Sequence, residues 1–220
     1  MRGGPQPAGV TTWVENPSGG RARGPRGLAR AWAEVLVRPA RFFRTGVAPG
    51  DQAPGLVFAV CVALAYAAGR FLFSPATVPG VVGDVAASAF IALAFVAVFV
   101  APAVLHLTAA VGTVSLLVAS LGYERGRGAF LRGRAGVSET VQVIAYASAP
   151  CALAGPPIPE LRAACALYGA ALLTLGVREV HATTTRRALV AAAPPAALLF
   201  GWGFRGAAGV ATLLTRWYVI

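Results

Sequence analysis

Residues 85–122, VAASAFIALAFVAVFVAPAVLHLTAAVGTVSLLVASLG, decide the fold of this chain. A single helix of this length would reach ~57 Å at ~1.5 Å per residue, whereas a bilayer core of ~30 Å needs only ~20 residues. Two crossings would require a turn, but only Pro102 and His106 stand near the middle, without a Gly, Asn or Asp cluster. We therefore expect one long helix, kinked at Pro102, that projects beyond the bilayer or lies along its interface.

The composition is that of an integral membrane protein. Of the 220 residues, 57% are hydrophobic and only 12% are charged, and the mean hydropathy is +0.68. Four more apolar segments approach the length of a crossing. These are residues 55–73, 139–154, 160–177 and 188–204. The sequence thus predicts an all-α helical bundle of about five transmembrane helices over residues 55–204.

Small residues and prolines occur within the apolar segments 160–177 and 188–204. Ala166 and Ala170, or Gly169 and Gly176, would let helix backbones approach closely in lipid, where packing drives association. The pair Pro194-Pro195 is expected to kink or break the final segment.

The distribution of arginine indicates the topology. All 19 basic residues are arginine, against eight acidic residues, for a net charge of +11. With five crossings, fifteen arginines lie on the side of the N terminus, and three, Arg162, Arg205 and Arg216, lie opposite, with Arg70 inside the first segment. The positive-inside rule then predicts a multi-pass cell-membrane protein with a cytoplasmic N terminus. Arginines between apolar segments suit anionic headgroups of the lipid bilayer rather than nucleic acid, which needs a soluble basic face.

The regions outside the membrane domain divide into three parts. Residues 1–27 are rich in Gly, Pro and Arg and lack the apolar core of a signal peptide, so a disordered cytoplasmic tail is expected. Residues 28–45 predict an amphipathic helix, bent at Pro39, with Trp32 on its apolar face; an ordinary surface helix packed on the bundle is the alternative. Its interfacial basic residues are Arg30, Arg38, Arg41 and Arg44. Residues 205–220 form a short C-terminal segment.

The apolar segment 139–154 carries the best candidate site. Glu139, Gln142, Tyr146 and Pro150 follow one another at helical spacing and so share one face. Polar groups in lipid turn inward, because an unpaired one facing hydrocarbon is costly. Such a face can contact a ligand or partner. It can equally supply hydrogen bonds between helices, with Glu139 stabilising a helix start.

Three further titratable residues extend this candidate site. Under the five-crossing topology, His106 is expected near Glu139 and able to pair with it. Glu179 and His181 follow the apolar segment 160–177 on the same side. Metal-ligand spacing is absent, and the three cysteines lie singly in apolar segments, so neither a metal nor a cofactor is expected. Nucleophile-elbow, HExxH and P-loop patterns are also absent, which argues against an enzyme.

The order of several motifs resembles the Yip1 domain family, especially its prokaryotic, archaeal-type branch. The motifs are WAEVLVRPARFF, with Pro39, Arg41, Phe42 and Phe43; VSETVQVIAYASAP, with Tyr146, Ala147 and Pro150; and CALYGAALLTLGVREVH, with Leu167, Tyr168 and Gly169. The resemblance implies a five-helix membrane protein with a cytoplasmic N terminus. Eukaryotic members are linked to membrane traffic and to contacts with prenylated small GTPases. They also carry a conserved DLYGP element, of which this chain has only LYG at 167–169.

Two functions remain open from the sequence. The first is a non-enzymatic scaffold that organises the membrane, in which the basic N-terminal region touches lipid headgroups or a cytoplasmic protein partner. The second is a small permease or channel in which Glu139, Gln142 and Tyr146 line a polar track.

Overall fold

The computed structural model describes residues 24–124, 128–131, 133 and 135–217. Most of the predicted N-terminal tail and the last three residues of the chain lie outside this range. The helices are α1 (Gly24–Val37), α2 (Pro39–Thr45), α3 (Ala53–Phe73), α4 (Val85–Phe95), α5 (Ala101–Ser120), α6 (Val137–Ala147), α7 (Pro159–Val180), α8 (Thr185–Ala196) and α9 (Gly206–Arg216). Between them lie two 3₁₀ turns, η1 (Pro75–Thr77) and η3 (Ala149–Leu153), and two π-helices, η2 (Val96–Val100) and η4 (Ala197–Gly203).

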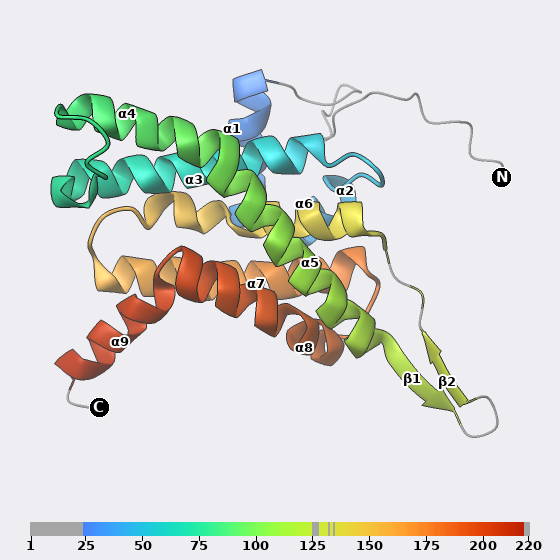
Figure 1. Ribbon diagram of the computed structural model, residues 1–220. Coiled ribbons are helices and arrows are strands. Elements are labelled where there is room, and N and C mark those ends of the chain that lie inside the picture. Colours follow the sequence, from blue (N-terminus) through green and yellow to red (C-terminus); the bar gives the residue numbers. More distant parts are fainter. Residues whose placement is uncertain (1–23, 125–127, 132, 134, 218–220) are drawn as a thin grey trace.

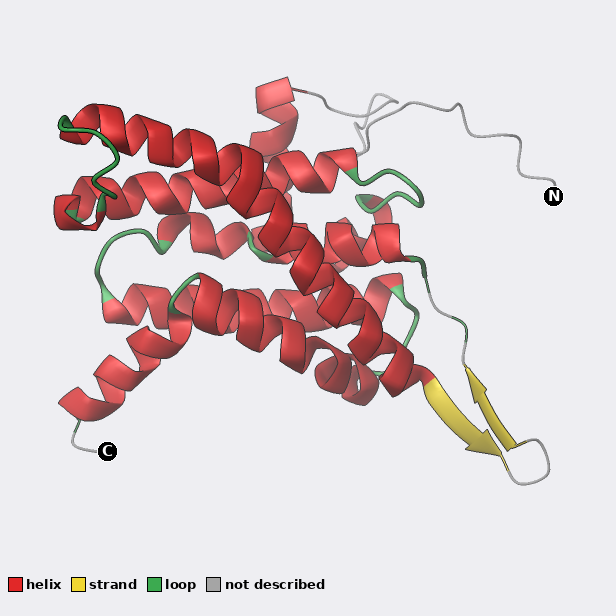
Figure 2. Cartoon of the chain, in the orientation of Figure 1, coloured by secondary structure: helices red, strands yellow, loops and turns green. Residues whose placement is uncertain are grey.

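The prediction of an all-α helical membrane bundle is confirmed (Figures 1 and 2). Three helices within the described residues are long and apolar enough to span a membrane: Ala53–Phe73, Val85–Ser120 and Pro159–Val180. The bent pair Thr185–Gly203 and Gly206–Arg216, with an angle of 73°, makes a fourth candidate. The segment predicted over 139–154 is not among them, because α6 has only 11 residues before the 3₁₀ turn η3.

The decisive stretch is one helical run. Residues Val85–Ser120 form a continuous helix of 36 residues, begun by Asp84, whose carboxylate accepts a hydrogen bond from the Ala87 N–H at 2.7 Å. The π-helical turn Val96–Val100 lies in its middle and ends two residues before Pro102. A proline ring collides with the carbonyl four residues earlier, and a π-turn is one way in which a helix accommodates that collision. The single-helix expectation is therefore confirmed.

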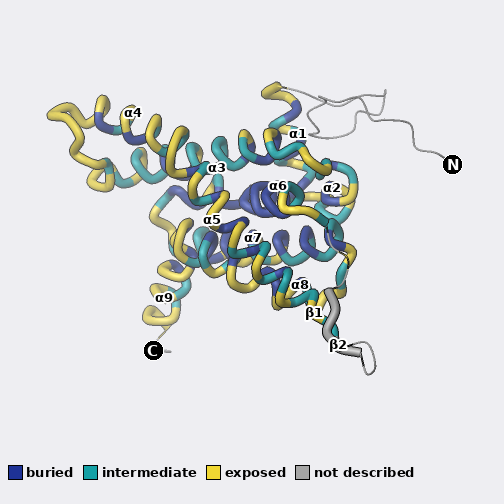
Figure 3. The backbone as a smooth tube through the Cα atoms, turned by 45° about the vertical axis from the view of Figure 1, so that its right-hand side comes forward, coloured by how far each residue is buried: buried dark blue, intermediate teal, exposed yellow. Residues whose placement is uncertain are grey.

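Helix α6 lies at the centre of the bundle (Figure 3). Every residue from Thr140 to Cys151 is buried. Gly55 of α3 packs against Gln142, Gly112 of α5 against Thr140 and Ile144, and Gly176 of α7 against Val143. From Thr140 onward the helix is thus enclosed by protein. Gln142 and Tyr146 of the predicted polar face lie in this buried part, whereas Glu139 is half-buried.

Small residues mark the close crossings, as expected. A Cβ on Gly176 would lie 2.7 Å from Val143 Cγ1 and 2.9 Å from the Phe43 ring. A Cβ on Gly169 would meet the Phe200 ring at 2.7 Å. The proline pair of α8 does not break the helix; it lies inside the helix and is followed by the π-helix Ala197–Gly203.

The N-terminal amphipathic segment is divided at Arg38, and α2 restarts with Pro39 at its first position, as the sequence predicts. Ala31 and Val35 of α1 are fully buried, and the Trp32 indole N–H donates to the Ala149 carbonyl at 2.9 Å. This segment therefore packs on the bundle, which was the alternative to a purely interfacial helix.

A β-hairpin was not expected from the sequence. Residues Leu121–Glu124 (β1) and Gly128–Leu131 (β2) pair as an antiparallel hairpin, with Leu121 opposite Leu131, beyond the end of α5 (Figure 2). The sequence indicated only an arginine-rich loop here. Two short strands of four residues leave most of the chain helical, so the fold class is unchanged.

Candidate functional site

Helix α2 is fixed to the bundle by an aromatic cluster. Phe42 and Phe43 are buried, and their rings meet edge to face at 5.8 Å. The Tyr146 ring of α6 lies edge-on to Phe42 at 4.8 Å and to Phe58 of α3 at 5.1 Å. Edge-to-face aromatic pairs stabilise beyond simple area burial. The cluster therefore joins α2, α3 and α6 at one end of the bundle.

The Gln142 side chain holds the loop that follows α2. Its Oε1 accepts from the Ala48 N–H at 3.1 Å, and its Nε2 donates to the Ala48 carbonyl at 2.6 Å. Both backbone groups of one loop residue are thereby satisfied inside the protein. The buried amide acts as a clamp between α6 and the loop from α2 to α3.

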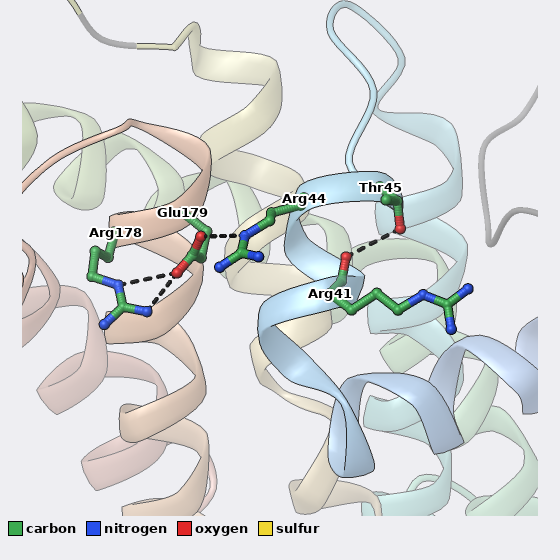
Figure 4. Close-up of polar contacts among 5 residues, drawn as sticks. All are labelled: Arg41, Arg44, Thr45, Arg178 and Glu179. Carbon is green, nitrogen blue, oxygen red and sulfur yellow. Dashed lines mark hydrogen bonds and ion pairs between the residues drawn. The ribbon is translucent and has the colours of Figure 1, made fainter.

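An ion-pair group joins the end of α2 to the end of α7 (Figure 4). The Arg44 Nε donates to Glu179 at 2.7 Å, and the Arg178 Nε donates to the other carboxylate oxygen at 3.1 Å. Hydrogen bonding to the Glu179 carboxylate raises the pKa of Arg44. The guanidinium of Arg41 points away from this group, while the Arg41 carbonyl accepts from the Thr45 hydroxyl at 3.1 Å. Arg44 is thus committed to Glu179, and Arg41 is left facing outward.

His181 lies beside the start of α6. Its ring is 3% exposed, and Nε2 is 3.4 Å from the Thr140 hydroxyl. It also lines a polar cavity of about 400 Å³ together with Thr184 and Arg187. The start of α6 and the turn between α7 and α8 therefore meet at the same end of the bundle as Arg44 and Glu179.

The whole of this region matches one known domain. The model of the Yip1 domain matches residues 33–205. The chain belongs to the Yip1 domain family. No curated protein and no solved structure shows significant similarity to it.

Within this Yip1 domain, the three motifs that carry the sequence resemblance converge. Phe42 and Tyr146 are ring partners, and Phe43 packs against Gly176. The Tyr168 hydroxyl donates to the Leu36 carbonyl at the end of α1. Three segments that are far apart in the chain thus combine to seat the α1–α2 unit on the bundle.

The candidate residues are only partly brought together. Gln142, Glu179 and His181 lie at the end of the bundle where α2 meets α6 and α7. Glu139 lies in the first turn of α6, where a carboxylate suits the helix dipole. His106 is exposed in the middle of the long helix, and its Nδ1 contacts the Pro102 carbonyl at 2.7 Å. Within the described residues, no ion pair or hydrogen bond joins His106 to Glu139.

The interfacial basic residues differ in their surroundings. Arg30 pairs with Glu34 at 3.4 Å, and Arg44 pairs with Glu179. Arg38 and Arg41 are exposed, and neither forms an ion pair with another described residue. The Arg30–Glu34 pair lies within α1, and the pair that reaches α2 has a largely exposed Arg44 side chain. Exposed ion pairs contribute little stability, so α2 is held mainly by its phenylalanines.

Three structural partners of the site were missed from the sequence. Ala48, Ala149 and Leu36 take part only through backbone groups, which no side-chain pattern announces. Trp32 and Tyr168 supplied the available signal, since each has a polar tip that can donate a hydrogen bond to such a backbone carbonyl.

No group of three His, Cys, Asp or Glu side chains in the described part of the chain could hold a metal ion. The Tyr146 hydroxyl, enclosed by Phe42 and Phe58, has no hydrogen-bond partner among the described residues.

Proposed function

We propose that this Yip1-domain protein is a non-enzymatic scaffold of the prokaryotic, archaeal-type branch, which organises the cell membrane through its basic α1–α2 unit. The N terminus faces the cytoplasm in this proposal, because with five crossings fifteen of the nineteen arginines in the sequence fall on the side of the N terminus. The main support for this proposal is that Phe42 and Phe43 fix α2 to the bundle while Arg38 and Arg41 remain exposed.

A seated helix is a favourable docking element. Arginines on an ordered backbone lose less conformational freedom on binding than arginines on a flexible tail. Arg38 and Arg41 lie on the same short helical unit, beside a Glu179 carboxylate already occupied by Arg44 and Arg178. The unit therefore presents positive charge to an acidic cytoplasmic protein surface, with anionic headgroups as the second possible contact.

The polar residues of α6 support a structural role instead of a permeation track. The Gln142 amide is bonded to Ala48, and Tyr146 is enclosed by aromatic rings. Neither residue lines the apolar cavity of about 350 Å³ that lies between α3, α5, α6 and η4.

Removing residues 1–45 would strip Phe42 and Phe43 from the core, so a sharper test uses point changes. In this test, a photo-crosslinking amino acid replaces Ala40, which lies between Arg38 and Arg41, and the protein is crosslinked in native membranes. We expect an adduct of discrete protein mass that disappears in the double variant Arg38→Glu, Arg41→Glu. Arg216→Glu, an exposed change on α9 at the other end of the bundle, should leave the adduct intact. Adducts of lipid mass alone, or a protein adduct that survives the double charge reversal, would contradict partner docking at α2.

A further inference from the structure

An apolar cavity of about 350 Å³ opens inside the bundle, at the end opposite to α2. Its walls come from α3, the long helix, α6 and the π-helix η4, with Ala63, Ile144 and Leu199 among the lining residues. The volume lies within the ~300–1,000 Å³ range of small-molecule sites. Because the walls are almost entirely apolar, an apolar chain is the natural occupant.

Both π-helices contribute to this cavity. Val96 and Val100 of η2 and Leu199 and Gly203 of η4 line it. A π-turn widens a helix locally and is found frequently at functional sites. Two π-helical turns, on separate helices, face this one cavity. We take this as a sign that the fold maintains the cavity.

The polar end of the cavity is formed around Tyr66. Tyr66 lines the cavity and is 8% exposed, and its buried hydroxyl has no hydrogen-bond partner among the described residues. The Arg70 guanidinium lies 5.9 Å from the centre of the Tyr66 ring. A buried hydroxyl normally has a partner, so an acceptor supplied by a bound molecule fits this position.

Three arginines gather at this end. Arg162 interacts electrostatically with Tyr66, Arg70 and Arg205, and it donates to the Ala154 and Gly155 carbonyls at 3.2 and 3.0 Å. Arg205 directly follows Phe204, whose ring meets Tyr66 edge to face at 5.1 Å. Like charges repel one another, and a bound anion relieves the repulsion.

The acids of this end are engaged elsewhere. Asp84 caps α4, and Glu160 pairs with Arg216 at 3.1 Å. Within the part of the chain that the structure describes, none of Arg70, Arg162 and Arg205 forms an ion pair. The site therefore combines an apolar chamber lined by Arg70 with two further guanidinium groups nearby that form no ion pair with a described residue.

We propose that this cavity binds one acyl chain of an anionic membrane phospholipid, whose phosphate is held by Arg70, Arg162 and Arg205 and hydrogen-bonded by the Tyr66 hydroxyl. Arginine and phosphate oxygens form strong charge-assisted hydrogen bonds. The site is independent of the docking proposed for α2, because it lies at the other end of the bundle and uses different residues.

Native mass spectrometry of the detergent-purified full chain tests this proposal. Phosphatidylglycerol and phosphatidylcholine with identical acyl chains are added in parallel, with glycerol phosphate as a headgroup without chains. We expect retention of phosphatidylglycerol at least about tenfold above phosphatidylcholine, since several arginines contact its charge. Glycerol phosphate should not be retained.

Two variants separate the chamber from the headgroup contacts. Ala63→Leu fills the chamber and should reduce retention of both lipids. The double variant Arg70→Gln, Arg205→Asn should lower phosphatidylglycerol to the level of phosphatidylcholine; Asn suits position 205 because the residue there has a left-handed φ of 59°. Arg216→Gln should change nothing. Equal retention of the two lipids by the wild type, or undiminished retention in Ala63→Leu or in the double variant, would overturn the proposal. Circular dichroism of each variant confirms that it is folded.

Discussion

The Gln142 side-chain amide forms hydrogen bonds with both the N–H and the carbonyl of Ala48, a residue 94 positions earlier in the chain. The contact links the most buried helix of the bundle to the loop between the basic α2 and the first long helix. It places a polar side chain in the core for an architectural reason, because the loop backbone would otherwise lack partners at this point.

Replacing Gln142 with Met is expected to destabilise the protein by about 1–3 kcal/mol, because the Ala48 N–H and carbonyl lose their partners while the side-chain volume is kept. Thermal unfolding in detergent, followed by circular dichroism, measures the change. Thr113→Val serves as the control, since the Thr113 hydroxyl bonds only to the Ala109 carbonyl of its own helix. A Gln142→Met variant as stable as the wild type would show that the clamp contributes nothing.

Replacing Tyr146 is expected to affect stability differently from replacing Gln142. The Tyr146 hydroxyl has no partner among the described residues, so Tyr146→Phe removes a buried polar group and should leave stability unchanged or slightly higher.

Phe42→Ala should cost about 3–5 kcal/mol, because it empties the centre of the aromatic cluster. The same unfolding measurement checks both. A loss above about 1 kcal/mol in Tyr146→Phe would mean that the hydroxyl makes a contact that matters.

Much of the architecture could be predicted from the sequence. Four of the five apolar segments match helical runs to within three residues, because charged, Gly and Pro residues interrupt the apolar runs at their ends. The exception is the segment 139–154, which divides into α6 and the 3₁₀ turn η3. The single helix over 85–120 followed from the absence of turn residues, and the restart of α2 followed from Pro39.

The surroundings of the candidate site could not be predicted in the same way. Periodicity placed Glu139, Gln142 and Tyr146 on one inward face, but it could not show that α6 is buried on every side by α2, α3, α5 and α7. His106 was expected beside Glu139, yet Gly112, six residues further along the helix, is the residue that packs on Thr140. Contacts between distant segments depend on helix crossing positions, which a single sequence does not encode locally.

Gly206 marks the 73° corner between the α8–η4 run and α9. A Cβ there would lie 2.2 Å from the Ala166 Cβ and 2.6 Å from the Phe200 carbonyl oxygen. Gly206→Ala should therefore destabilise by about 1–3 kcal/mol through overpacking, despite the better helix propensity of alanine. Gly201→Ala is the matched control, because its nearest neighbour would be 4.0 Å away, and it should be neutral in the same thermal scan. Equal melting temperatures for the two variants would contradict the close α7–α9 contact.

The topology can be tested with single cysteines in a background where Cys61, Cys151 and Cys165 are replaced by Ala. With a cytoplasmic N terminus and five crossings, Pro49→Cys and Gly133→Cys lie inside, whereas Val81→Cys and Ile158→Cys lie outside. A membrane-impermeant maleimide added to intact cells should label only the outer pair, and permeabilisation should add the inner pair. Labelling of the inner pair alone in intact cells would mean that the bundle is inverted. Labelling of Gly133→Cys and Ile158→Cys from the same side would show that residues 137–153 enter the bundle without crossing the membrane.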